Sequence, residues 1–238
     1  MYINETKFLS TMMKRGLSHI EFVISFVLFI GFVLFAFVFF NPLQSQRTLK
    51  SSMDYAWIEV SQETQEKLDT YSVYIFSASG DVALDISDVH NSYNASVEDV
   101  DGNIIETYTD ASGEVNFNTN GKEFFRIKYS PALLNGNTLS GTPPNQYSIS
   151  SSTSEKIYFE SLLLNLNDTY FLDYEGLKQK INLPNRVDFG FVVKFGDVDV
   201  LAVNEIPEGV EVLSRSDRID VIRNSGKRER AELRVLVW

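Results

Sequence analysis

Cysteine is absent from the 238 residues of this chain, and histidine occurs only as His19 and His90. Without cysteine the chain has no disulfides, thiolate metal ligands or cysteine nucleophiles. Two histidines, one beside an apolar run and one in a polar stretch, do not supply a Ser-His-Asp triad or a histidine-rich metal site. Glycine-rich phosphate loops are also missing. We therefore expect no enzymatic activity, no cofactor and no metal.

The chain has few basic residues, with 21 Lys and Arg against 32 Asp and Glu, and its net charge is −11. A nucleic-acid partner requires a basic surface, so we expect none. Asp99, Asp101 and Asn103 resemble the start of a calcium loop. However, Ile104 stands where that loop needs glycine, and Asp110 stands where it needs a bidentate glutamate. We predict a turn there.

The most apolar segment is residues 22–40, which only Ser25 and Gly31 interrupt. As a helix it would span about 28 Å, close to the hydrocarbon thickness of a bilayer. A helix apolar on all sides is either a membrane span or a deep core element. A cleavable signal peptide is a third alternative, but its apolar region is shorter and ends in a small-x-small site, which "FVFFNPLQ" lacks. We therefore predict a single-pass membrane protein.

Orientation follows from the flanking charges. Lys7, Lys14 and Arg15 precede the run, and Arg47 and Lys50 follow it closely. The positive-inside rule then mildly favours a cytoplasmic N-terminus. We expect the rest of the chain to lie outside the cytoplasm, in the cell envelope or in a surface filament.

Residues 14–22, "KRGLSHIEF", resemble the class III signal peptide of type IV pilin precursors, including archaeal-type pilins and pilin-like proteins. In that family a membrane-embedded prepilin peptidase removes a short basic leader by cutting after a glycine. The resemblance implies Lys14, Arg15, Gly16 and Leu17 as processing residues, with the cut before Leu17. Glu21 would be the fifth residue of the mature chain, where many members carry glutamate.

Two features depart from the family pattern. Leu17 stands where many bacterial members begin with phenylalanine, and the chain is long for an archaeal-type major pilin. The length favours a minor or pilin-like subunit.

Glu21 is costly in this position, because a carboxylate within hydrocarbon costs about 2.5 to 3.5 kcal/mol and usually marks a function. Cleavage would create an α-amino group at Leu17, in the same chain or a neighbour, whose charge could pair with Glu21 and fix the helix register. Alternatively, Glu21 is a helix-start residue at the interface, and Ser18 is the N-cap of a box formed by residues 18–21.

After Pro42, apolar residues recur at helical spacing and predict an amphipathic helix to about Lys67. These residues are Leu49, Met53, Ala56 or Trp57, Val60 and Leu68. We expect a leader at residues 1–16, a pilin-like helical region at 17–68 and a β-rich head at 69–238, with a lobe boundary within 130–155. The resemblance implies that the head packs on the second half of the helix.

From Tyr71 onward, short runs rich in β-branched and aromatic residues predict antiparallel strands separated by glycine-containing turns. These runs are "YSVYIF", "VALDIS", "NIIETYT", "EVNFN", "FFRIKYS", "VDFGFVVKF", "VDVLAV", "RIDVIRN" and "RAELRVLVW". Residues 97–117 also resemble hairpins of extracellular β-sandwich modules, which implies an Ig-like or prealbumin-like sandwich. The expected fold class is α+β.

Three further segments complete the head. The polar residues 135–154 predict an exposed loop or a boundary. "EKIYFESLLL" predicts a strand followed by a short helix, and residues 173–181 a second helix with Asp173 as N-cap. "SGKRE" predicts a hairpin turn at Gly226.

The resemblance implies a pilin-like structural subunit, a minor one, of a type IV pilus-like filament or pseudopilus. Its expected partners are membrane lipid, a prepilin peptidase and other pilin-like subunits. One alternative is an adhesin or binding module on an uncleaved signal anchor, and another is an anchored hydrolase. Asn94 and Asn167 begin Asn-x-Ser/Thr triplets and are candidate glycosylation acceptors.

Overall fold

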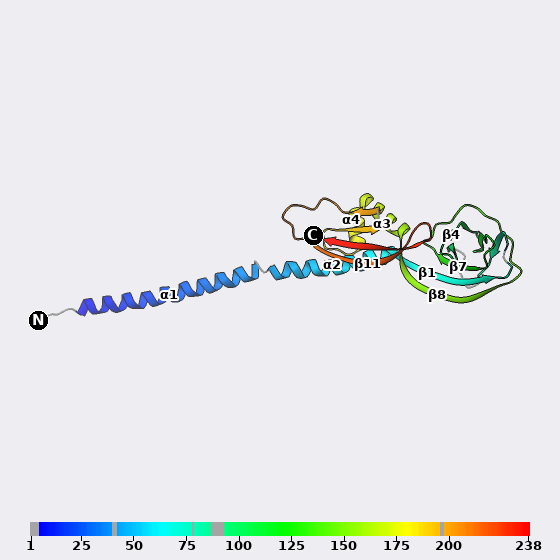
Figure 1. Ribbon diagram of the computed structural model, residues 1–238. Coiled ribbons are helices and arrows are strands. Elements are labelled where there is room, and N and C mark those ends of the chain that lie inside the picture. Colours follow the sequence, from blue (N-terminus) through cyan, green and yellow to red (C-terminus); the bar gives the residue numbers. More distant parts are fainter. Residues whose placement is uncertain (1–4, 40–41, 78, 87–92, 196–197) are drawn as a thin grey trace. The chain divides into compact units, whose positions relative to one another are not determined.

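The computed structural model describes residues 5–39, 42–77, 79–86, 93–195 and 198–238 (Figure 1). For residues 5–18, 38–39, 42–48 and 198 it describes the backbone alone. His90 lies outside the described residues. The chain divides into two compact units, residues 1–48 and 49–238.

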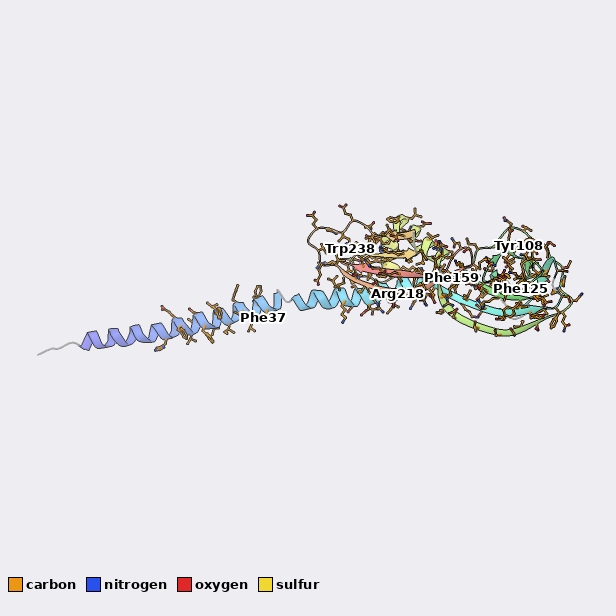
Figure 2. The ribbon with its side chains drawn as sticks, in the orientation of Figure 1. Phe37, Tyr108, Phe125, Phe159, Arg218 and Trp238 are labelled. Atoms are coloured by element: carbon orange, nitrogen blue, oxygen red, sulfur yellow. The ribbon has the colours of Figure 1, made fainter. Side chains whose placement is uncertain are left out.

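Helix α1 (Glu5–Phe39) contains a segment, His19–Phe37, that is long and apolar enough to cross a membrane. Its mean hydropathy is 2.6. Most side chains of this segment are exposed, and Phe37, labelled in Figure 2, is 72% exposed. A helix whose apolar side chains face outward on all sides is suited to lipid or to other apolar helices. The predicted N-terminal apolar helix is confirmed.

Helix α2 (Pro42–Thr64) begins at proline, which is tolerated in the first helical turn because its missing N–H would have no partner there. The predicted end near Lys67 is wrong. The helix ends at Thr64, and strand β1 (Gln65–Ile75) follows without a connecting loop. Leu68 therefore belongs to a strand, where it is buried, and not to the helical stripe.

The described part of the head contains a nine-stranded sheet, in the order β10-β9-β12-β11-β8-β1-β7-β3-β4, and a three-stranded sheet, β2-β6-β5. It also contains helices α3 (Glu160–Leu172) and α4 (Tyr174–Lys180). The fold is α+β, as predicted. The remaining strands are β2 (Asp81–Leu84), β3 (Asn94–Asp99), β4 (Ile104–Ile105), β5 (Thr107–Thr109), β6 (Val115–Asn118), β7 (Phe124–Ser130), β8 (Tyr147–Phe159), β9 (Phe189–Phe195), β10 (Val198–Ala202), β11 (Leu213–Ile222) and β12 (Arg228–Val237).

The large sheet has two parts that meet at one narrow junction. Strands β10, β9, β12 and β11 form one antiparallel part, and β8, β1, β7, β3 and β4 form the other. Between them, β11 and β8 pair in parallel at only two positions, Val221 with Tyr158 and Ile222 with Phe159. Within the described residues, β11 and β8 form no further backbone pairs.

Each part of the sheet has its own hydrophobic core. Helices α2, α3 and α4 pack against β9 to β12, and the helical stripe of Met53, Ala56, Trp57 and Val60 is buried there, as predicted. At the other end, residues of the three-stranded sheet share a core with β1, β3 and β7; the rings of Phe117 and Phe125, for example, lie 5.0 Å apart.

The prediction of a loop is wrong for its serine-rich part. Residues 147–154 belong to the 13-residue strand β8, which pairs with β1 along its length. Their side chains are exposed, so the pattern carries no burial signal, but pairing with β1 satisfies the backbone. Both short helices and the hairpin at Gly226 are confirmed, and Asp173 caps α4 by accepting a hydrogen bond from Gly176 N at 3.0 Å.

Candidate functional site

The predicted processing residues lie within α1. The backbone at Lys14, Arg15, Gly16 and Leu17 is helical, and their side chains lie outside the described part of the chain. Because α1 begins at Glu5, Ser18 does not start a helix in the uncleaved chain. The capping-box alternative for Glu21 is therefore wrong for the chain with its leader.

Glu21 lies inside the candidate span and is exposed. Its helical neighbours Ile20, Phe22, Val23 and Ile24 are each more than half exposed, so the carboxylate sits on an apolar surface. Glu21 forms no ion pair with any residue that the structure describes. A carboxylate placed in hydrocarbon is costly and usually marks a function.

The predicted turn at Asp99 is confirmed. Asp99 Oδ1 accepts hydrogen bonds from the backbone N–H groups of Asp101 and Asn103, both at 2.9 Å. The Lys122 ammonium forms ion pairs with both Asp99 and Asp101. This ammonium and the Asn103 hydrogen bonds hold the pKa of Asp99 well below its usual range. Among the described residues, no group of three His, Asp or Glu side chains could hold a metal ion.

The two candidate glycosylation acceptors lie on regular elements. Asn94 begins β3, and its side-chain amide donates to Leu133 O at 2.8 Å. Asn167 lies within α3 and is half-buried.

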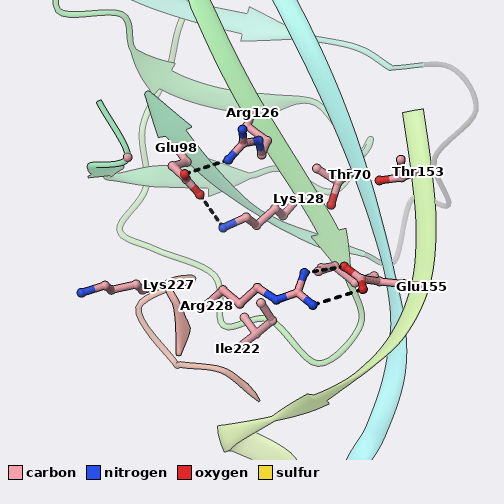
Figure 3. A pocket seen from close by; sticks show the side chains of 11 residues that line it. Thr70, Glu98, Arg126, Lys128, Thr153, Glu155, Ile222, Lys227 and Arg228 are labelled. Atoms are coloured by element: carbon pink, nitrogen blue, oxygen red, sulfur yellow. Dashed lines mark hydrogen bonds and ion pairs between the residues drawn. The ribbon is translucent and has the colours of Figure 1, made fainter. Parts of the chain in front are cut away.

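A cavity of about 400 Å³ lies where the two parts of the large sheet separate (Figure 3). Its lining comes from β1, β3, β7 and β8 on one side and from β11 and β12 on the other. At this place the strands β8 and β11 pair at only two positions. Leu68 and Ile222, which are 2% and 1% exposed, are the two large apolar residues of the lining.

Strand register places the charged lining on one face of the sheet. Side chains alternate along β7, so Arg126 and Lys128 point away from the core formed by Phe125 and Ile127. Glu98 on β3 lies directly opposite Arg126. Glu98 accepts a hydrogen bond from Arg126 Nη1 at 3.0 Å and from Lys128 Nζ at 2.6 Å. One carboxylate is therefore shared by two cations.

A second ion pair joins the two sides of the cavity, because Glu155 lies on β8 and Arg228 on β12. The Arg228 guanidinium donates to both carboxylate oxygens of Glu155, at 2.9 and 3.3 Å, and to Asp220. Figure 3 shows this pair facing the Glu98 cluster across the cavity, with Thr70 and Thr153 alongside. Lys227 lies at the margin, with its ammonium turned away from the other cations.

Lys128 is the least exposed cation of the cavity, at 5%. The tip of the β11–β12 hairpin covers it, and Lys128 Nζ donates to Gly226 O at 3.1 Å. Burial of an ammonium without partners costs much free energy. The hydrogen bonds of Lys128 to Glu98 and Gly226 offset that cost.

Sequence reasoning missed this cavity. The alternation of "FFRIKYS" places Arg126 and Lys128 on one strand face, which is the only local signal. Glu98, the partner of Arg126, lies 28 residues away in the chain, and Gly226, a partner of Lys128, lies 98 residues away. Contacts over such separations form only in the tertiary fold.

The chain was compared with protein-family models, curated proteins and solved structures, and none of them matches it.

Proposed function

We propose that this protein is a pilin-like structural subunit, a minor component of a type IV pilus-like filament or pseudopilus. A prepilin peptidase would cut between Gly16 and Leu17, and the subunit would then assemble through side-by-side packing of its N-terminal helices. The observation that carries the proposal is the sequence "KRGLSHIEF" at the start of an apolar helical segment long enough to span a membrane.

Two structural features support this proposal. Glu21 is an exposed carboxylate among apolar side chains, without an ion-pair partner in the described residues. The second helix, α2, packs one apolar stripe into the β-rich head, which leaves Tyr55 and Ile58 exposed on its outer face. Subunits that assemble through helices need both an apolar contact surface and a group that fixes the register.

The proposal includes three finer points. The head lies outside the cytoplasm, which the flanking charges mildly favour, because three basic residues precede the span and two follow it closely. The sheet β2-β6-β5 and the β1, β3 and β7 part of the large sheet form a sandwich-like lobe over their shared core. Finally, the chain is a minor subunit because its head is large for a major archaeal-type pilin.

The assembly role is tested by Glu21→Val. Loss of the carboxylate should leave membrane insertion intact and lower incorporation into filaments by about tenfold or more, because a paired charge in low dielectric is lost. The matched control is Glu59→Val on α2, which removes the same charge outside the candidate span. Incorporation is measured by immunoblot of sheared filaments against the membrane fraction. Equal incorporation of the Glu21 variant would remove the register role.

A second candidate function is a binding module held by an uncleaved signal anchor. The charged cavity in the head favours it, because a subunit used only for assembly needs no such cavity. An intact N-terminus in the presence of active prepilin peptidase would select this alternative.

A further inference from the structure

We propose that two copies of this chain join their heads through strand β8, which pairs antiparallel with the β8 strand of the other copy. The contact uses the open edge of β8, residues 147–157, and lies outside α1 and α2. It therefore goes beyond the assembly role proposed for the N-terminal helices.

One edge of β8 has no strand beside it for most of its length. On one side the strand pairs with β1 from Gln65 to Ile75. On the other side, within the described residues, it pairs only at Tyr158 and Phe159, with β11. Residues 147–156 are all exposed, and Figure 1 shows β8 along the outside of its part of the sheet with β1 beside it. The outward N–H and C=O groups of this edge are available to a further strand.

Strand β8 lacks the charges and prolines by which edge strands avoid pairing with other chains. Residues 147–154 contain no Lys, Arg, Asp, Glu or Pro. The pairing with β1 shifts register once, at Ser150, and is regular from Ser151 to Tyr158. A long, uncharged edge of this kind is a template for another strand.

The other edges of the described sheets are short or charged. The strands at the ends of the two sheets, β10, β4, β2 and β5, are five residues long or shorter. The part of β11 that does not pair with β8 carries Arg215, Asp217 and Arg218. Both short length and charge oppose pairing between edges. Length and neutrality together therefore distinguish β8.

The sequence of β8 is complementary to itself. In an antiparallel pair around a two-fold axis through Ser152, the serine and threonine side chains of residues 150–154 face one another. Such hydroxyl pairs stabilise neighbouring strands through hydrogen bonds. Glu155 then faces Ile149, and Lys156 faces Ser148, so no like charges are opposed.

Two further points favour a second copy in this register. The paired stretch ends before Tyr158 and Phe159, so the existing pairs with β11 are kept. A strand of another protein would gain the main-chain hydrogen bonds, but small hydroxyl side chains would give it little specificity. An identical strand also gains the matched hydroxyl pairs.

The absence of cysteine from the chain allows a direct test, because a single engineered cysteine can form a disulfide only with another copy. Ser152→Cys in the full chain, in detergent micelles, is oxidised mildly and analysed on a gel without reductant. Residues that face each other in an antiparallel pair have Cα atoms about 4.5 to 5.5 Å apart, within the range of a disulfide. We expect at least about ten times more cross-linked dimer than from the control Ser216→Cys, an exposed serine of β11. Equal cross-linking of the two variants would overturn the proposal.

A charge at the axis provides a second test that needs no cysteine. Ser152→Lys places two ammonium groups opposite each other and should raise the dimer dissociation constant by about tenfold or more in sedimentation. Ser216→Lys is the control and should leave the constant unchanged. A dimer that survives Ser152→Lys with unchanged affinity would contradict pairing through β8.

The same cross-link separates this proposal from the assembly role. Glu21→Val leaves β8 intact, so the Ser152→Cys cross-link should persist in that background even where filament assembly is lost. Loss of the cross-link in the Glu21→Val background would contradict a contact made by the heads alone.

Discussion

Gly226 lies where the β11–β12 hairpin contacts strands β3 and β7 of the other part of the sheet. It has φ of +83° in the tip of the β11–β12 hairpin, and its carbonyl accepts the hydrogen bond from buried Lys128. A Cβ atom there would lie 1.8 Å from Ser96 Oγ on β3. The hairpin tip can therefore approach β3 only with glycine at this position.

Gly226→Ala is expected to destabilise the head by about 2 kcal/mol or more, because strain at positive φ adds to the clash with Ser96. Gly209→Ala is the control, since Gly209 has φ of +78° and nothing within 4 Å of its added Cβ. Urea unfolding of both variants gives the difference. Equal destabilisation by both variants would contradict the clash with Ser96, because it would show that the hairpin tip shifts to accommodate the added Cβ atom at little cost.

The ionisation of Asp99 makes the free energy of unfolding depend on pH in the acid range. Its lowered pKa means that the ionised form stabilises the folded chain fully above the ordinary aspartate pKa, near 4. This contribution is lost as the pH falls from about 4 through the lower pKa of the folded state. We expect Asp99→Asn to flatten the acid limb of the stability profile, measured by urea unfolding at several pH values. Asp168→Asn, at an exposed helical position, is the control. An unchanged acid limb would contradict the role of Lys122.

Among the helices and strands, α3 is held to the sheet through Tyr170. The phenol donates to Phe189 O at 2.7 Å on β9 and accepts from Asn204 N at 3.1 Å, just after β10. Its ring also packs edge-on against Phe189 and Phe191. Burial raises the pKa of Tyr170 to about 12. One side chain thus connects one helix to two strands.

Tyr170→Phe should cost about 1 to 3 kcal/mol, because a buried carbonyl and a buried N–H each lose their partner while the ring stays. Tyr55→Phe on α2 is the matched control; Tyr55 is 57% exposed, and we expect a change near zero. Chemical denaturation distinguishes the two. A loss below about 0.5 kcal/mol for Tyr170→Phe would mean that water replaces both hydrogen bonds.

Elements with local determinants could be predicted from the sequence, and those with distant ones could not. Asp173 caps α4 through a hydrogen bond to a residue three positions later, and Gly226 lies within the turn that it forms. Both features could therefore be predicted from local sequence. Strand β8 is different, because residues 147–154 are polar and exposed and become a strand only by pairing with β1. The end of α2 at Thr64 has the same cause, since β1 begins there to pair with β7 and β8.

At the scale of the whole molecule, the chain combines an apolar helix with a β-rich head that has its own cores. The helix could be predicted because residues 22–40 are apolar apart from Ser25 and Gly31, which leaves few alternatives. The cavity could not, because it forms between sheet parts that only the tertiary fold brings together. In the function that we propose, the N-terminal residues determine anchoring and assembly.

The central claim concerns the N-terminus, and the most direct measurement is the first residue and the intact mass of the membrane-extracted protein. The protein is co-expressed with an active prepilin peptidase, and Gly16→Val serves as the control that should stay uncleaved. We predict a chain that begins at Leu17 and remains in the membrane, because the segment from His19 to Phe37 survives the cut. A wild-type chain that still begins at Met1 would contradict the pilin-like account and indicate a simple signal anchor.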